Sequence, residues 1–309
     1  MSDVVRPEVD ILMATYNGTL YIKDQINSIL YQSFKNWRLI IRDDGSSDGT
    51  LDILQHYARL DSRIIVCDDD LGNLGVFGNF MELIKLSDSK YVMLADQDDL
   101  WINDKVETSL SFIKEKERGI VPILVFANSI LTDDSLTKKY GYNYNMTEPP
   151  SLHNFLFYNA GYQGSGMIFN DYLRMKIFPF FENCLIHDYH ISLVGLLLGE
   201  VHHISRPLML YRRHESSTTL QNIDLQSRVL WFLKKKTYLY TPDLVKYLNV
   251  FFEYYIKEID EEKKALIHNY LRIIDENNSI IKRLFAIYKG GFSLRESKAY
   301  LMFKLILVK

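Results

Sequence analysis

Several of the residues that can do chemistry are carboxylates that follow short apolar runs. Asp96, Asp98 and Asp99 come directly after YVMLA, and Asp43 and Asp44 come after WRLIIR. Closely spaced carboxylates repel one another unless a cation neutralises them, and oxygen ligands suit Mg²⁺ or Mn²⁺. A divalent ion there can bridge a diphosphate and stabilise the charge of a leaving group. The alternative is a pair of surface turns whose aspartates cap the following helices.

The segments that must position these carboxylates alternate in type over the first hundred residues. Short β-branched runs predict strands, and the amphipathic segments between them predict helices. The expected strands span 9–15, 37–44, 63–69 and 91–99, and the expected helices 21–34, 50–60 and 79–87. This alternation favours an α/β fold with a mostly parallel sheet and helices on both faces. Ligands bind at the carboxyl ends of strands in such sheets, so the polar loops should converge on one edge.

The pattern changes twice further along the chain. Between residues 121 and 219 strands are mixed with a helix at about 188–199, and helical periodicity dominates from about Leu225. We place a boundary near Leu220. It separates a body of residues 1–220 from a smaller α-helical C-terminal region of residues 221–309.

Three ordered motifs in the body together resemble a known family. The first strand ends in ATYNG, the second in RDDGSSDGT and the fourth in ADQDDLW. This order resembles the inverting family 2 glycosyltransferases with the GT-A nucleotide-diphospho-sugar transferase fold, over roughly residues 9–214. The detailed residue pattern of these motifs looks like that of the bacterial rhamnosyltransferase branch. The resemblance implies a donor half at about 1–100, an acceptor half at about 101–220, and transfer of rhamnose from dTDP-rhamnose to a polysaccharide or lipid-linked saccharide.

The resemblance also implies roles for individual residues. The donor-binding positions are Thr15, Asn17, Asp43, Asp44, Asp96 and Arg212. Asp98 matches the metal-binding carboxylate, with Asp99 in support, and His214 is a further metal ligand, so the implied cofactor is Mn²⁺ or Mg²⁺. The loop at 71–80 resembles the one that lies along the donor and should enter a helix at Asn79.

Asp188 matches the position of the general base, a late acidic residue at a helix start. An inverting transfer is one in-line displacement and needs one carboxylate to take the acceptor proton. A helix N-terminus favours the ionised form that accepts it. The alternative is that Asp188 only caps its helix. Branch members carry an aromatic pair after the His-Asp, whereas this chain has Tyr189-His190, so its acceptor contacts are expected to differ.

The charge is unevenly distributed. Of 36 Lys+Arg and 39 Asp+Glu in the chain, 16 and 9 lie from Gln226 onward. This basic, aromatic tail predicts a peripheral contact with an anionic membrane surface, and a solvated helical face is the alternative. The N-terminus does not read as a signal peptide and no run is long enough to span a bilayer, so we expect a cytoplasmic location at the inner face of the membrane.

Two other functions are compatible with the sequence. One is a transferase of the same fold that uses a UDP-hexose, because the base-contacting residues do not separate thymine from uracil donors. The other is a non-catalytic nucleotide-sugar-binding subunit at the membrane, against which the intact acidic set argues. The acidic body contains no recognised nucleic-acid-binding module, so no nucleic-acid partner is expected.

Overall fold

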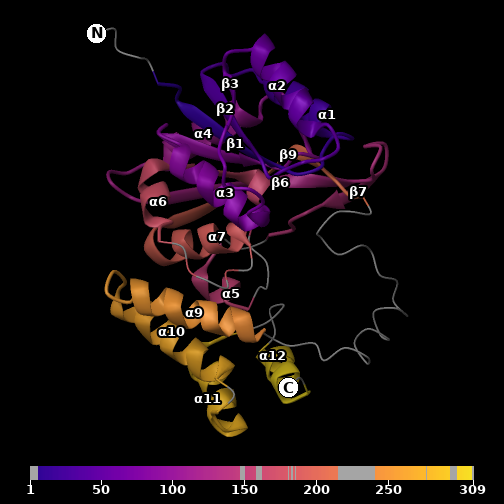
Figure 1. Ribbon diagram of the computed structural model, residues 1–309. Helices are drawn as coiled ribbons and strands as arrows, with labels where there is room; N and C mark the ends of the chain where they lie inside the picture. Colours follow the sequence, from indigo (N-terminus) through magenta and orange to yellow (C-terminus); the bar gives the residue numbers. More distant parts are fainter. Residues whose placement is uncertain are drawn as a thin grey trace.

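The computed structural model describes residues 6–146, 150–157, 162–179, 181, 184, 186–214, 241–275, 277–292 and 298–307. Within them a central sheet carries helices on both faces, and a group of C-terminal helices packs below one of these helical layers (Figure 1). The expected α/β fold is therefore confirmed.

Nine strands of the described residues form one sheet. They are β1 (Val9–Thr15), β2 (Trp37–Asp43), β3 (Ile64–Val66), β4 (Tyr91–Ala95), β5 (Leu100–Trp101), β6 (Ile123–Thr132), β7 (Lys139–Tyr142), β8 (Met167–Asn170) and β9 (Glu200–Arg212). Their order is β3-β2-β1-β4-β8-β6-β9-β5, with β7 paired to β6. The first four are parallel, and β8 runs antiparallel to both β4 and β6. The loops that follow β1, β2 and β4 therefore leave from one edge.

Helices cover both faces of this sheet. They are α1 (Ile22–Leu30), α2 (Thr50–Leu60), α3 (Gly75–Leu86), α4 (Lys105–Lys116), α5 (Leu152–Phe155), α6 (Asp171–Lys176) and α7 (His187–Leu198). Ile11 and Met13 of β1 lie in one core with α1, α2 and α4, whereas Leu12 lies in the other with α3, α6 and α7. A strand that is buried on both faces reads as a nearly continuous apolar run, as in YVMLA of β4 and ILMA within β1, and this makes both strands recognisable from sequence.

Helix α3 begins at Gly75, four residues before the expected start at Asn79. The backbone N–H groups of Leu74 and Gly75 both donate to the Asp44 carboxylate, each at 2.8 Å. A carboxylate at a helix N-terminus satisfies free N–H groups and is favoured by the helix dipole. The cap is supplied by Asp44, the residue after β2, so the sequence next to α3 does not reveal it.

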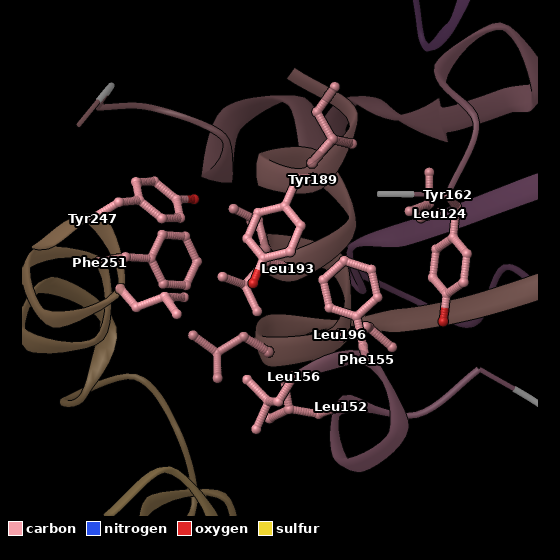
Figure 2. Packing of buried hydrophobic residues seen from close by; sticks show 14 of the residues in the cluster. Leu124, Leu152, Phe155, Leu156, Tyr162, Tyr189, Leu193, Leu196, Tyr247 and Phe251 are labelled. Atoms are coloured by element: carbon pink, nitrogen blue, oxygen red, sulfur yellow. The ribbon is translucent and has the colours of Figure 1, made fainter. Parts of the chain in front are cut away.

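The C-terminal helices are α9 (Pro242–Tyr255), α10 (Glu261–Ile274), α11 (Ile280–Gly290) and α12 (Lys298–Leu307). The expected boundary near Leu220 lies outside the described residues. Figure 2 shows Tyr189 and Leu193 of α7 beside Tyr247 and Phe251 of α9. The body and the C-terminal helices thus share one apolar core.

His190 joins the two parts of this core by hydrogen bonds. The ring is fully buried, with Nδ1 2.8 Å from the Tyr247 hydroxyl and Nε2 2.7 Å from the Ile177 carbonyl. A carbonyl only accepts, so Nε2 carries the proton and Nδ1 accepts from Tyr247. Burial lowers the pKa of His190 to about 4, which keeps the ring neutral. His190, which stands where the resembled branch has an aromatic residue, therefore lies in the core between α7 and α9.

Replacing Tyr247 by Phe should lower the free energy of unfolding by about 1–3 kcal/mol, because Nδ1 of His190 would stay buried without a partner. Urea denaturation would measure this change. Tyr254→Phe is the matched control, since Tyr254 lies on the same helix and is 50% exposed. Equal stability of the two variants would show that the hydrogen bond does not hold α9 to α7.

Candidate functional site

The loops after β1 and β2 interlock at the carboxyl edge of the sheet. The Thr15 hydroxyl donates to the Asp43 carboxylate at 2.9 Å. Asn17 has a φ of 47°, accepts at Oδ1 from the Ser47 N–H at 2.9 Å, and donates its own N–H to the Ser46 hydroxyl at 2.8 Å. Asn tolerates this left-handed conformation better than most residues. Thr15, Asn17 and Asp43 are thus brought together.

Asp44 is engaged in a different way. Its side chain is almost completely buried, and its carboxylate accepts from the guanidinium of Arg42 at 2.8 Å as well as from the first turn of α3. Arg42 also forms two hydrogen bonds to Asp69, at 2.9 and 3.0 Å, and these lower the pKa of Asp69. Arg42 and Asp44 tie the loop at 69–75 to β2. A direct contact between Asp44 and a donor would have to displace one of these bonds.

The carboxylates after β4 differ in environment. Asp99 is fully buried and accepts from the Ser165 hydroxyl at 2.8 Å. Burial, together with Asp98 and Asp96, raises the pKa of Asp99 well above its ordinary value. Partial burial and the neighbouring Asp98 raise the pKa of Asp96 to about 6.

A buried lysine lies behind this cluster. Lys105, at the start of α4, donates to the Ser165 carbonyl, and its ammonium is 4.2 Å from the centre of the Trp101 ring. Burial lowers the pKa of Lys105 to about 7, although the charges of Asp99 and Asp96 oppose this shift. Lys105 is not predictable from the sequence, because nothing in WINDK distinguishes it from an exposed lysine of a first helical turn.

Asp98 and His214 lie in contact at the partly exposed side of the cluster. Nε2 of His214 is 2.8 Å from the Asp98 carboxylate, and the His214 ring packs against Tyr21 with the centroids 4.8 Å apart. The Asp98 carboxylate is the ligand type that suits Mn²⁺ or Mg²⁺, and Mg²⁺ usually completes its shell with water and substrate phosphates, whereas the His214 imidazole is a less typical ligand of these ions. In the part of the chain that the structure describes, no three His, Cys, Asp or Glu side chains form a ready metal site.

Arg212 is turned into the protein. Its guanidinium donates to the backbone carbonyls of Asp98, at 2.9 Å, and Asp134, and is 3.1 Å from the carboxylate of Asp24. These contacts brace the loop after β4. The neighbouring Arg213 differs, because its Nε–H is buried with no acceptor among the described residues.

Gln97 is a second residue that the sequence analysis did not single out. Its side-chain amide accepts from the Tyr16 N–H at 2.9 Å and donates to the Tyr16 carbonyl at 3.0 Å. Gly18 lies close beside it, and a Cβ there would lie 2.4 Å from the Gln97 Oε1, so a larger residue would displace the Gln97 side chain. Gln97 therefore locks the loop after β4 to the loop after β1.

Asp188 lies in the first turn of α7. Burial, followed by the charge of Asp96, raises the pKa of Asp188 to about 7, and its Oδ1 is buried with no hydrogen-bond partner in the described chain. Gly164 packs against this turn, since a Cβ there would lie 2.6 Å from Nε2 of His187. His187 is stacked on Phe80 with the ring centroids 4.0 Å apart, and burial lowers its pKa to about 3. A Cβ at Gly164 would also lie 3.5 Å from the Asp188 Cβ, and the next residue, Ser165, donates to Asp99, so Asp188 lies near the carboxylates that follow β4.

The model of the family described as Glycosyl transferase family 2 matches residues 10–176. The chain belongs to this family. It is a glycosyltransferase, and the mixed sheet described above is the GT-A fold.

The chain is similar to relatives named as glycosyltransferases and, in fold, to solved structures. The chain is 38% identical to "Putative teichuronic acid biosynthesis glycosyltransferase TuaG" of Bacillus subtilis over 112 residues, which cover 36% of this chain and 44% of TuaG. It is 28% identical to "dTDP-rhamnosyl transferase RfbG" of Shigella flexneri over 232 residues, which cover 70% of this chain and 76% of RfbG. The crystal structure of S. aureus TarS 1-349 in complex with UDP-GlcNAc has a TM-score of 0.60 at 14% identity, covering 92% of this chain and 80% of that one. The match thus spans less than half of TuaG, and the TarS likeness shows the fold.

Asp44→Asn should lower the free energy of unfolding by about 3 kcal/mol, because it leaves the buried Arg42 with one anionic partner fewer. Asp43→Asn is the control, since Asp43 is partly exposed. It should lower the free energy of unfolding by less than half as much. Thermal and urea denaturation of both variants would measure the difference. Equal losses would mean that Asp44 is no more structural than Asp43.

Proposed function

We propose that this family 2 glycosyltransferase moves rhamnose from dTDP-rhamnose to a saccharide acceptor, either a growing polysaccharide or a lipid-linked saccharide, with inversion at the sugar carbon. The donor is supported by RfbG, whose printed name is that of a dTDP-rhamnosyl transferase and whose match covers 70% of this chain. UDP-hexoses are the competing donors.

The environment of Asp188 is the observation that carries this proposal. Its pKa of about 7 matches the requirement for a general base near neutral pH, and its unpartnered Oδ1 is able to accept a proton. The acceptor hydroxyl gives its proton to Asp188 while its oxygen forms a bond to the sugar carbon. The bond from that carbon to the diphosphate oxygen breaks on the opposite side, so the configuration inverts in one displacement.

The donor nucleotide is assigned to the interlocked loops after β1 and β2. Thr15, Asn17 and Asp43 present polar groups there for the base and ribose. Asp44, in contrast, holds the loop at 69–75 in place by accepting the Gly75 N–H. Among the late arginines, Arg213 has the buried donor without an acceptor, so we assign the diphosphate contact to it in preference to Arg212.

Asp98 and His214 would hold Mn²⁺ or Mg²⁺, with Asp96 beside them. When bound, the ion supplies positive charge for the leaving diphosphate. Buried Asp99 and Lys105 hold the loop that carries Asp98.

The body of residues 1–220 forms the catalytic domain in this proposal. Its donor half is about 1–100 and its acceptor half about 101–220, and residues 221–309 form the helical C-terminal region. We place the enzyme in the cytoplasm at the inner face of the membrane, where a lipid-linked acceptor would be presented.

Asp188→Asn should reduce kcat at least about a hundredfold while donor affinity stays within about threefold, because the amide cannot take the acceptor proton. In the wild type, kcat/KM should rise as the pH increases through about 7, since the ionised carboxylate is the active form. Steady-state kinetics and donor calorimetry measure both. Normal turnover in the Asn variant would remove Asp188 as the base.

Mn²⁺ should strengthen the binding of dTDP-rhamnose more than that of UDP-glucose, UDP-galactose or UDP-N-acetylglucosamine. Asp98→Ala should abolish this metal effect, because it removes the carboxylate ligand. Isothermal calorimetry with and without Mn²⁺ gives the affinities directly.

Asp104→Ala is the control for that measurement, since Asp104 pairs with Arg206 and carries no part of the proposed site. An Asp98→Ala protein that still responds to Mn²⁺ would defeat the metal assignment. A preference for a UDP-sugar would keep the transferase assignment and replace the donor.

A further inference from the structure

Helix α11 exposes an apolar stripe. Ile281, Phe285 and Tyr288 are 76%, 64% and 71% exposed, and their spacing of four and three residues puts them on one face. The other side of the helix buries Ala286 and Ile287 in the core. The helix is therefore apolar on two faces, and only one of them has a partner in the described residues.

Two lysines flank this stripe. Lys282 and Lys289 each follow a stripe residue by one position and are both exposed, so they lie along the same side of it. Arg283 is used within the fold, since its Nε–H donates to the Ile273 carbonyl at 2.7 Å. The stripe and its lysines form a surface that is apolar in the middle and basic at the margin.

The surface lies at one end of the molecule. In Figure 1, α11 and α12 form the end farthest from the sheet, with α9 and α10 between them and the body. Helix α12 adds the exposed side chains of Lys298 and Ile306 at this end. No described helix is both long and apolar enough to cross a bilayer.

We propose that the α11 stripe docks on an anionic lipid bilayer. The three apolar side chains would enter the boundary between headgroups and acyl chains, and Lys282 and Lys289 would meet the lipid phosphates. Single exposed apolar residues are ordinary, but an apolar face with a basic margin is typical of interfacial helices. A second copy of the chain fits less well, because two such faces in contact would bring lysines together. The inference rests on the proposed function only in so far as a lipid-linked acceptor would lie at the membrane. Vesicle binding itself can be measured without turnover.

Flotation of the full-length protein with vesicles of equal parts phosphatidylglycerol and phosphatidylcholine tests this proposal. Replacing the three stripe residues by Ser should reduce partitioning at least about a hundredfold. The matched control is Leu60→Ser/Leu86→Ser/Ile120→Ser, which removes three exposed apolar side chains from the body and should change partitioning by less than about twofold. Lys282→Gln and Lys289→Gln should each cost about fivefold, and pure phosphatidylcholine should bind weakly.

Full vesicle binding by the stripe variant would overturn the proposal. The proposal would also be overturned if the wild type binds no vesicles and light scattering shows that it is a dimer while the stripe variant is a monomer. The stripe would then bind a second copy of the chain. Donor calorimetry on the same variants separates the two hypotheses. A stripe variant that loses vesicles and keeps donor affinity supports the surface, whereas a wild type that binds vesicles and no nucleotide sugar would sink the proposed function alone.

Discussion

Electrostatic repulsion among carboxylates at one edge of the sheet is the constraint on which the site depends. Asp96, Asp98 and Asp99 follow β4 at this edge, and Asp188 lies in the first turn of α7. Two features reduce this repulsion. Lys105 lies buried beside the carboxylates, and the pKa values of the buried carboxyl groups of Asp99 and Asp188 are raised. A cation and a proton acceptor at this edge are the two features that the proposed sugar transfer requires.

The sequence predicts most of the elements that build this edge. Strand β4 is an unbroken apolar run and β1 contains the apolar run ILMA, because both faces of these strands are buried, so the loops that follow them could be placed at one edge. The start of α3 was predicted wrongly, since its cap comes from Asp44, 30 and 31 residues earlier than the N–H groups it accepts from. The hydrophobic periodicity of a helix contains no information about a capping residue so distant in sequence.

The orientation of individual side chains was less predictable than the composition of the site. Asp43 and Asp44 are neighbours in sequence, yet one lies at the rim and the other is buried against Arg42. Arg212 meets Asp24 across 188 residues of chain. His190 departs from the family pattern, and its partner Tyr247 lies in a helix that no motif connects to the body. Each outcome depends on packing between segments that are distant in sequence.

The first turn of α7 has a consequence for how the enzyme can evolve. Buried His187 and His190 destabilise the fold as the pH falls below the ordinary histidine pKa, because the unfolded chain then takes up protons that the folded chain does not. Asp188 acts in the opposite sense: its raised pKa means that ionisation destabilises the fold as the pH rises from about 4 to about 7. If Asp188 is the proposed base, the ionised carboxylate that accepts the proton is also the form that weakens the fold. Selection for heat resistance alone would favour the loss of that aspartate, whereas selection for the proposed transfer reaction would retain it.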